Sequence, residues 1–218
     1  MTEQPQQPPY LSNPDGPPVV LASQSRVRAA LLEGAAIPFA TMPARVDEDM
    51  VKQSLATENA PAKHVAETLA ELKAIKVSNA VLSRGATGTF VIGADQVLEC
   101  NGVMFDKPVD MDHAHAHLKA LSGKLHRLWS ATVVAKDGAP IWRKIAHASL
   151  TMRPLSDQMI GRYLEVAGDV VLTSCGAYQV EGPGIQLFAH IEGDQSTIQG
   201  LPLLPLLDFL RVNNVIPD

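Results

Sequence analysis

The chain has 218 residues, a formal net charge of −5, 46% hydrophobic residues and 19% charged residues. This balance is ordinary for a globular protein, and the acidic charge argues against a general nucleic-acid coat or a binder of anionic membranes. No run approaches the ~20 apolar residues that span a bilayer, and the N-terminus does not resemble a signal peptide. We therefore expect a cytoplasmic protein that binds neither nucleic acid nor membrane.

The order of the chain predicts one domain after an unstructured lead-in. Residues 1–18 are rich in Pro and Gln and are predicted to be disordered. From residue 19 to residue 218, strands, helices and hairpins alternate, which indicates an α/β fold with a mixed twisted sheet and flanking helices. The two cysteines, Cys100 and Cys175, are far apart and fit no metal or redox spacing.

Ordered structure is predicted to begin with a short buried strand at residues 19–23. A helix follows, with Ser25 as its N-cap and Gly34 as its stop signal. Residues 37–46 have an extended pattern and lead into an acidic loop at residues 47–50.

The next helix is predicted from Ala62 to Ser83. Its expected apolar stripe consists of Leu69, Leu72, Ile75 and Leu82. A buried strand, Phe90 to Ile92, then stops at Gly93-Ala94 and presents Asp95. An Asp often ends a strand in a turn. Alternatively, the strand carries Asp95 into a site, where two small residues leave room for a ligand to approach.

The second half of the chain contains two predicted hairpins, which turn at Asn101-Gly102 and at Asp137-Gly138. A short helix from about Asp112 to Leu121 lies between them. The remaining predicted elements are a helix at 156–167, a Gly-rich loop at 175–184, a strand at 185–193 and a final helix at 201–212.

Two common phosphate-binding signatures are absent from the sequence. "LSGKLH" lacks the residues of a P-loop, and "EGPGIQ" lacks the third glycine of a dinucleotide fingerprint. "LASQSRVR" instead places Ser23, Ser25 and free backbone N–H groups at the positive end of a helix. Arg26 and Arg28 lie in this first turn, so either an anion sits nearby or both arginines are solvated on a capped surface helix.

Acidic and basic side chains recur at strand ends and in loops, notably at residues 47–49, Asp95 and Lys107. Hydrolysis of a phosphoanhydride needs a metal held by carboxylates, cations near the phosphate oxygens and an acceptor for the proton of water. Each charge alone is also typical of a solvated loop, so only their convergence in space is informative. In "HAHAH", His113 and His117 share a helix face, a pattern more often found at a surface than at a metal site.

The chain resembles the Maf family of nucleotide pyrophosphatases from Val19 to Val212. The blocks that carry this resemblance, in family order, are "LASQSRVRAALL", "VDED", "LAELKA", "VIGADQV", "FDKP", "LSGKLH", "GAYQVEGPG" and "GLPL". The resemblance implies two lobes around a central cleft, often in a homodimer. It implies hydrolysis of a nucleoside triphosphate to the monophosphate and pyrophosphate with Mg²⁺ or Mn²⁺. Family members act on dTTP and UTP or on 7-methyl-GTP, and the family is tied to nucleotide-pool housecleaning and to inhibition of septum formation.

The resemblance also implies roles for individual residues. Asp95 matches the catalytic acid, which accepts the proton of water or helps to hold the metal, and Glu48 matches a second metal ligand. On this reading Gly93 and Ala94 let the substrate reach Asp95. Ser23 and Arg28 match residues that bind phosphate, and Ser25 is a further candidate for substrate binding. Lys73 and Lys107 match lysines that face the phosphates and are candidate catalytic residues.

Several positions depart from the family pattern of the dTTP/UTP type. Arg26 stands where the family usually has Pro, and Val27 follows at a position that helps to set base specificity. Gln96 stands in place of Thr and Glu181 in place of Gln, and both resemble the 7-methyl-GTP type. A carboxylate at Glu181 accepts from a base amino group or faces a methylated, cationic base.

The alternative to an enzyme is a non-enzymatic regulator of septum formation that binds a nucleotide as a signal. A pure binder needs the cations but not Asp95, and the chain retains both. No G-x-S-x-G motif supports a metal-free Ser hydrolase.

Overall fold

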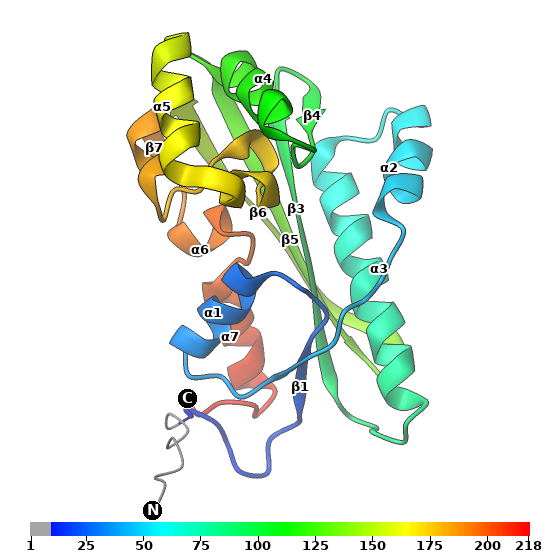
Figure 1. Ribbon diagram of the computed structural model, residues 1–218. Coiled ribbons are helices and arrows are strands. Elements are labelled where there is room, and N and C mark those ends of the chain that lie inside the picture. Colours follow the sequence, from blue (N-terminus) through cyan, green and yellow to red (C-terminus); the bar gives the residue numbers. More distant parts are fainter. Residues whose placement is uncertain (1–9) are drawn as a thin grey trace, which may run out of the picture.

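A seven-stranded mixed sheet forms the centre of the computed structural model, which describes residues 10–218 (Figure 1). The strand order is β2-β1-β3-β5-β6-β7, and β4 also pairs with β3. β1 runs parallel to β2 and β3, whereas the other pairs are antiparallel. The predicted α/β class with mixed strand directions is confirmed. The strands are β1 (Val19–Leu21), β2 (Ala40–Thr41), β3 (Phe90–Cys100), β4 (Val103–Phe105), β5 (Leu125–Lys136), β6 (Ala139–Met152) and β7 (Phe188–Glu192).

Both predicted hairpins are present, and their turns have the backbone conformation that their sequences favour. Asn101-Gly102 joins β3 to β4, with φ angles of 52° and 80°. Asp137-Gly138 joins β5 to β6, with φ angles of 50° and 83°. Two successive positive φ angles define the type I′ turn, which suits Asn or Asp followed by Gly.

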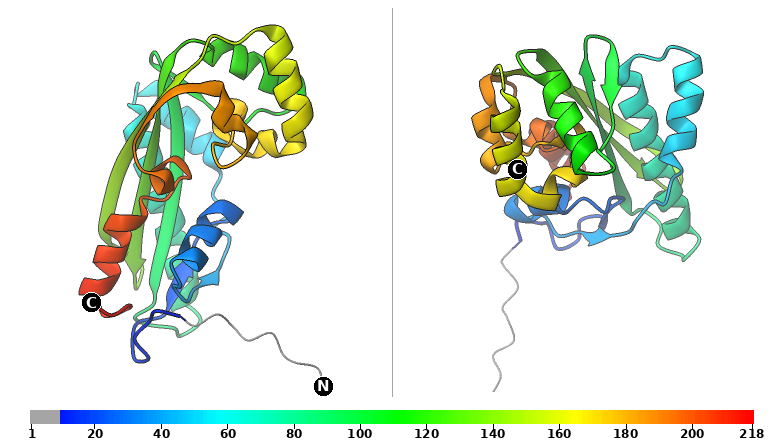
Figure 2. Two further views of the ribbon diagram at one scale, coloured as in Figure 1. Left: turned by 90° about the vertical axis from the view of Figure 1, so that its left-hand side faces the viewer. Right: turned by 45° about the horizontal axis from the view of Figure 1, so that its top comes forward.

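Helices cover both faces of the sheet, and neighbouring residues of β3 face different helices (Figures 1 and 2). Val97 packs in one apolar cluster with α3, whereas Leu98 packs with α4 and α5. Near the start of β3, Ile92 packs with α1 and α7 in a separate cluster. The face opposite α3 thus carries two separate apolar cores. The helices are α1 (Arg26–Gly34), α2 (Glu48–Thr57), α3 (Ala62–Leu82), α4 (Met111–Leu121), α5 (Asp157–Ala167), α6 (Gln195–Ile198) and α7 (Leu203–Val212), with short 3₁₀ segments at Gly168–Thr173, Cys175–Ala177 and Pro183–Leu187.

The predicted acidic loop at residues 47–50 is wrong, because this segment starts α2. The Asp47 side chain accepts a hydrogen bond from the Met50 backbone N–H at 3.1 Å and so caps the helix. Glu48 and Asp49 occupy the first turn, where negative charge interacts favourably with the helix dipole. The same three acids are thus a helix-start signal.

The strand that carries Asp95 is longer than predicted, because β3 pairs with β5 from Phe90 to Glu99. Gly93 lies within this strand, and a Cβ atom there would clash with the backbone of Ala70 and Ala74 on α3. The expectation that Gly93 makes room for the substrate is therefore wrong. Its missing side chain lets α3 lie directly on the sheet.

Close contact with the sheet also decides which residues of α3 are buried. The helix itself is confirmed within one residue of its predicted end. Of the expected stripe, Leu69 is buried but Leu72 is exposed. The buried face is made mainly of small residues, namely Ala62, Val65, Ala66, Ala70, Ala74, Val77, Ser78 and Val81.

The described chain starts beside its C-terminal end (Figure 1). The Asn13 backbone N–H donates to the Val215 carbonyl at 3.0 Å, and that of Leu11 donates to the Ala36 carbonyl at 2.9 Å. The part of the predicted disordered segment that covers residues 1–9 lies outside the described residues. Among the helices from residue 10 onward, none combines the length and apolar character that a membrane crossing requires.

The buried His126 side chain on β5 is expected to make the protein less stable in acid. Its side chain is buried, with Nε2 2.8 Å from the Tyr178 hydroxyl oxygen. Burial lowers the pKa of His126 to about 4. An unfolded chain takes up this proton near its ordinary pKa of about 6.5, so the stabilisation is present above that pH and is lost as the pH falls toward 4.

We expect the free energy of unfolding of wild type to fall by about 2 kcal/mol more than that of His126→Asn between pH 7 and 4.5. Urea unfolding at the two pH values measures this difference. Exposed His190→Asn is the matched control and should lose as much stability as wild type. Equal losses in wild type and His126→Asn would contradict the assignment.

Candidate functional site

Asp95 lies on a stretch of β3 that is open on one side. β1 pairs with β3 only as far as Ile92, and β4 pairs only from Leu98. Within residues 10–218, β3 therefore has no strand partner on this side between positions 93 and 97. Side chains from elsewhere approach this edge instead. Arg28 Nη1 donates to the Ala94 carbonyl at 2.9 Å, and Cys175 Sγ lies 4.0 Å from the Gln96 carbonyl oxygen.

Lys73 brings the two predicted metal ligands together. Its Nζ lies 2.5 Å from Asp95 Oδ1 and 2.7 Å from Glu48 Oε1. Asp95 and Lys73 are only 5% and 8% exposed, whereas the Glu48 side chain is more open to solvent. Since these residues come from β3, α3 and α2, the fold joins three segments that are far apart in the sequence.

The lysines around Glu48 favour its ionised form. Partial burial raises the pKa of Glu48, but the hydrogen bond from Lys73 and the charges of Lys73, Lys52 and Lys107 outweigh it and lower this pKa. Lys107 is exposed in the loop after β4. Its effect on Glu48 indicates that this loop contributes positive charge to the same site.

Ser23 and Ser25 shape the start of α1. The Ser25 hydroxyl caps the helix by accepting a hydrogen bond from the Arg28 backbone N–H at 3.3 Å. The Ser23 hydroxyl accepts one from the Ser25 backbone N–H at 3.1 Å. The predicted N-cap is confirmed. Both serines follow the end of β1, and Arg28 links the Ser23 hydroxyl to the Ala94 carbonyl on the open part of β3.

Arg28 is half-buried and bonded to protein groups, so it is not the freely solvated arginine of one of the two alternatives. Besides its bond to Ala94, its guanidinium donates to the Gly200 carbonyl at 2.9 Å and to the Ser23 hydroxyl at 3.4 Å. Burial lowers the pKa of Arg28, and the negative charges of Asp95 and Glu48 oppose this shift. The side chain thus fastens the first motif to the strand that carries Asp95, while Arg26 remains exposed.

The three predicted base-specificity residues do not join this cluster. Gln96 Nε2 donates to the Ser130 hydroxyl at 2.8 Å and to the Thr197 carbonyl at 3.0 Å. Its amide therefore contacts β5 and α6, on the face of β3 opposite Asp95. Val27 is half-buried in α1, and Glu181 is exposed in the loop before the last 3₁₀ segment. Among residues 10–218, no hydrogen bond or ion pair joins these three side chains to Lys73.

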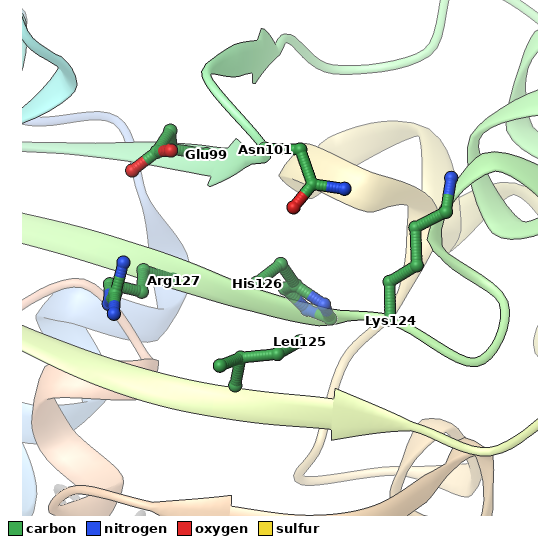
Figure 3. Close-up of a pocket in the computed structure, with 6 residues that line it drawn as sticks. All are labelled: Glu99, Asn101, Lys124, Leu125, His126 and Arg127. Atoms are coloured by element: carbon green, nitrogen blue, oxygen red, sulfur yellow. The ribbon is translucent and has the colours of Figure 1, made fainter.

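Two cavities differ in their relation to the site. One of about 250 Å³ lies between the β3–β4 turn and the start of β5, where Figure 3 shows Asn101 and Lys124 at its border; it contains none of the predicted site residues. The other, of about 330 Å³, adjoins the start of α1 and includes both predicted serines. It is lined by Ser23, Gln24, Ser25, Arg26, Ala29, Thr41 and Pro43.

Sequence reasoning missed three neighbours of the cluster. Lys52 lies on α2 and pairs with Asp106, with 2.5 Å between Nζ and Oδ1. Burial raises the pKa of Cys175 to about 11; the charge of Asp95 adds to this, and Lys52 and Lys107 oppose it. The sequence did contain a signal for Lys52. It lies four residues after Glu48, so the two side chains share a face once this segment is recognised as a helix.

The histidines of α4 lie in two different environments. His113 is exposed, as expected, but the surface prediction is wrong for His117, which is 8% exposed. The His117 ring packs against Phe105 and His113, with centroid distances of 5.2 Å and 4.2 Å. In the part of the chain from residue 10 onward, no three His, Cys, Asp or Glu residues are grouped as ligands for a metal ion.

Comparison with known proteins shows similarity along nearly the whole chain. The family model described as "Maf-like protein" matches residues 18–213. A nucleoside triphosphate pyrophosphatase of Hyphomonas neptunium is 47% identical over 199 residues, covering 91% of this chain and 98% of the relative. One of Paramagnetospirillum magneticum is 52% identical over 194 residues, covering 89% and 97%. A 7-methyl-GTP pyrophosphatase of Brucella abortus is 50% identical over 193 residues, covering 88% and 94%.

Proposed function

Since this chain belongs to the Maf family, we propose that it hydrolyses a nucleoside triphosphate to the monophosphate and pyrophosphate. The observation that carries this proposal is the convergence of Glu48, Lys73 and Asp95 at the open edge of β3. Hydrolysis of a phosphoanhydride requires carboxylates that hold a metal and cations that offset the charge of the phosphates. This cluster contains both types of residue. The names of similar proteins support the same reaction.

Glu48 and Asp95 are the residues that would hold Mg²⁺ or Mn²⁺. Their oxygens contact the same ammonium group of Lys73, so they lie close enough to share one cation. Mg²⁺ is commonly held by one or two carboxylates together with substrate phosphates, which fits a pair of acids rather than a complete protein cage. When bound, such a metal offsets charge on phosphate oxygens and activates water.

The other proposed roles concern the attacking water and the phosphates. Asp95 is proposed to accept the proton of the attacking water when it is not a metal ligand, because a carboxylate is a suitable base. Lys73 and Lys107 offset the charge of the phosphates. Ser23, Ser25 and Arg28 bind phosphate at the start of α1, where backbone N–H groups and the helix dipole favour anions.

For the base, we propose a preference for a 7-methyl-GTP-like nucleotide. Gln96 and Glu181 resemble that type, and the Brucella abortus relative carries that name. The Gln96 side chain bonds to α6, so we propose that it affects base preference indirectly, by positioning that helix. Val27 and Glu181 are the candidates for contact with the base. Hydrolysis of dTTP or UTP far faster than of 7-methyl-GTP would refute this preference.

A pyrophosphate-release assay tests the function directly. The purified chain is mixed with canonical nucleoside triphosphates and with 7-methyl-GTP, each with Mg²⁺, with Mn²⁺ or with EDTA. We expect release of pyrophosphate that depends on the metal. Nucleotide binding without turnover would instead favour the regulator of septum formation. The homodimer and the cytoplasmic location stay predictions. Size measurement in solution tests the first, and cell fractionation tests the second.

A further inference from the structure

Lys52 faces the same space as the proposed catalytic residues. It lies one helical turn after Glu48 on α2, so the two side chains share a helix face. Its Nζ pairs with Asp106 on the loop after β4, next to Lys107 in the chain. The Lys52–Asp106 pair therefore joins α2 to that loop beside the open edge of β3.

Electrostatic effects agree with this placement. Burial lowers the pKa of Lys52, but the hydrogen bond and charge of Asp106, together with the charge of Asp95, raise it above its ordinary value. Lys52 in turn helps to lower the pKa of Glu48. The Lys52 ammonium is therefore charged and acts on both proposed metal ligands.

Two of the other cations of the site, Arg28 and Lys73, are already bound to protein groups. Arg28 donates to backbone carbonyls, and Lys73 is held between two carboxylates with a side chain only 10% exposed. Lys52 has a more accessible side chain, 29% exposed, and its partner Asp106 is 67% exposed. An ion pair with such an open partner stabilises a protein little, so a phosphate group can replace the partner at small cost.

We propose that Lys52 is a further substrate-binding residue, which leaves Asp106 and binds the phosphates of the nucleotide. Asp106 holds the ammonium beside the site until the substrate arrives. The inference rests on the proposed function and adds to it a phosphate ligand from α2, whose first turn already supplies Glu48. Lys52, Glu48 and the triphosphate would then order α2 against the rest of the site.

Binding of inert ligands tests the proposal separately from catalysis. Calorimetry measures the dissociation constants of inorganic tripolyphosphate and of the α,β-methylene analogue of the best nucleotide substrate. Loss of a charged hydrogen bond predicts that Lys52→Met weakens both by about tenfold. Asp106→Asn, which frees Lys52, is expected to bind at least as tightly as wild type. Lys119→Met is the matched control, because it removes an exposed pair with Asp157 away from the site, and it should bind like wild type.

The double variant Lys52→Met/Asp106→Asn separates direct contact from an indirect effect. If Lys52 binds phosphate, the double variant stays about tenfold weaker than wild type. Recovery of wild-type binding would overturn the proposal, because the loss would then come from an unpaired Asp106 repelling phosphate. Equal weakening by Lys52→Met and Asp106→Asn would also overturn it and assign the pair a bracing role. A wild-type chain that hydrolyses nucleotides while Lys52→Met binds normally refutes this inference alone, whereas a wild-type chain that neither binds nor hydrolyses them refutes the proposed function as well.

Discussion

Asp95→Asn is expected to lower kcat by about three orders of magnitude, because an amide can neither accept the proton of water nor donate negative charge to a metal. The amide nearly matches the carboxylate in shape, so the fold should persist. Removal of the charge leaves Lys73 paired with Glu48 alone. Steady-state pyrophosphate release measures the effect, and circular dichroism with thermal unfolding verifies the fold.

The control for this variant is Asp49→Asn, an exposed acid in the first turn of α2 beside Glu48. It changes the net charge equally but makes no contact with Lys73 in the described structure, so we expect turnover within about twofold of wild type. Near-normal turnover in Asp95→Asn would remove this residue from the mechanism. An equal loss in both variants would indicate a general charge effect.

Gly93→Ala is expected to destabilise the protein by about 3 kcal/mol, the upper end of the usual effect of overpacking. The added methyl group would meet the backbone of Ala70 and Ala74, and a helix backbone cannot rotate away as a side chain can. To accept it, α3 has to move off the sheet. Because α3 carries Lys73, we also expect a loss of activity in whatever fraction remains folded.

Urea unfolding of Gly93→Ala and Gly161→Ala provides a matched comparison. Gly161 lies inside α5, and a Cβ atom there would meet nothing within 4 Å. Alanine is the better helix former, so Gly161→Ala should stabilise the protein by about 0.5–1 kcal/mol. A Gly93→Ala protein as stable as wild type would show that α3 and β3 are not packed backbone to backbone.

Features that depend on a few neighbouring residues were predictable. The turns at Asn101-Gly102 and Asp137-Gly138 follow from residues that tolerate positive φ. The cap of α1 follows from the Ser25 hydroxyl. The start of α2 also depends on neighbouring residues, but it was not predicted, because the acids at 47–49 were interpreted as site charges and not as a helix start.

Features that depend on partners far away in the sequence were predicted less well. The end of β3 was placed too early because its continuation depends on the pairing with β5. The buried face of α3 was expected to carry Leu72, yet close approach to Gly93 selects Ala70 and Ala74 instead. The hydrophobic periodicity of one segment does not reveal that β3 pairs with β5 or that α3 packs on Gly93.

For the site, the family blocks in the sequence were enough to single out Glu48, Lys73 and Asp95, because residue types and their order are properties of the chain alone. Their contact, and the presence of Lys52 and Asp106 beside them, depended on the tertiary structure. The ion pairs that join α2, α3 and β3 depend on the relative positions that the fold gives these elements. Distances across the sheet are not encoded in spacing along the chain, so the folded structure alone shows which charges meet.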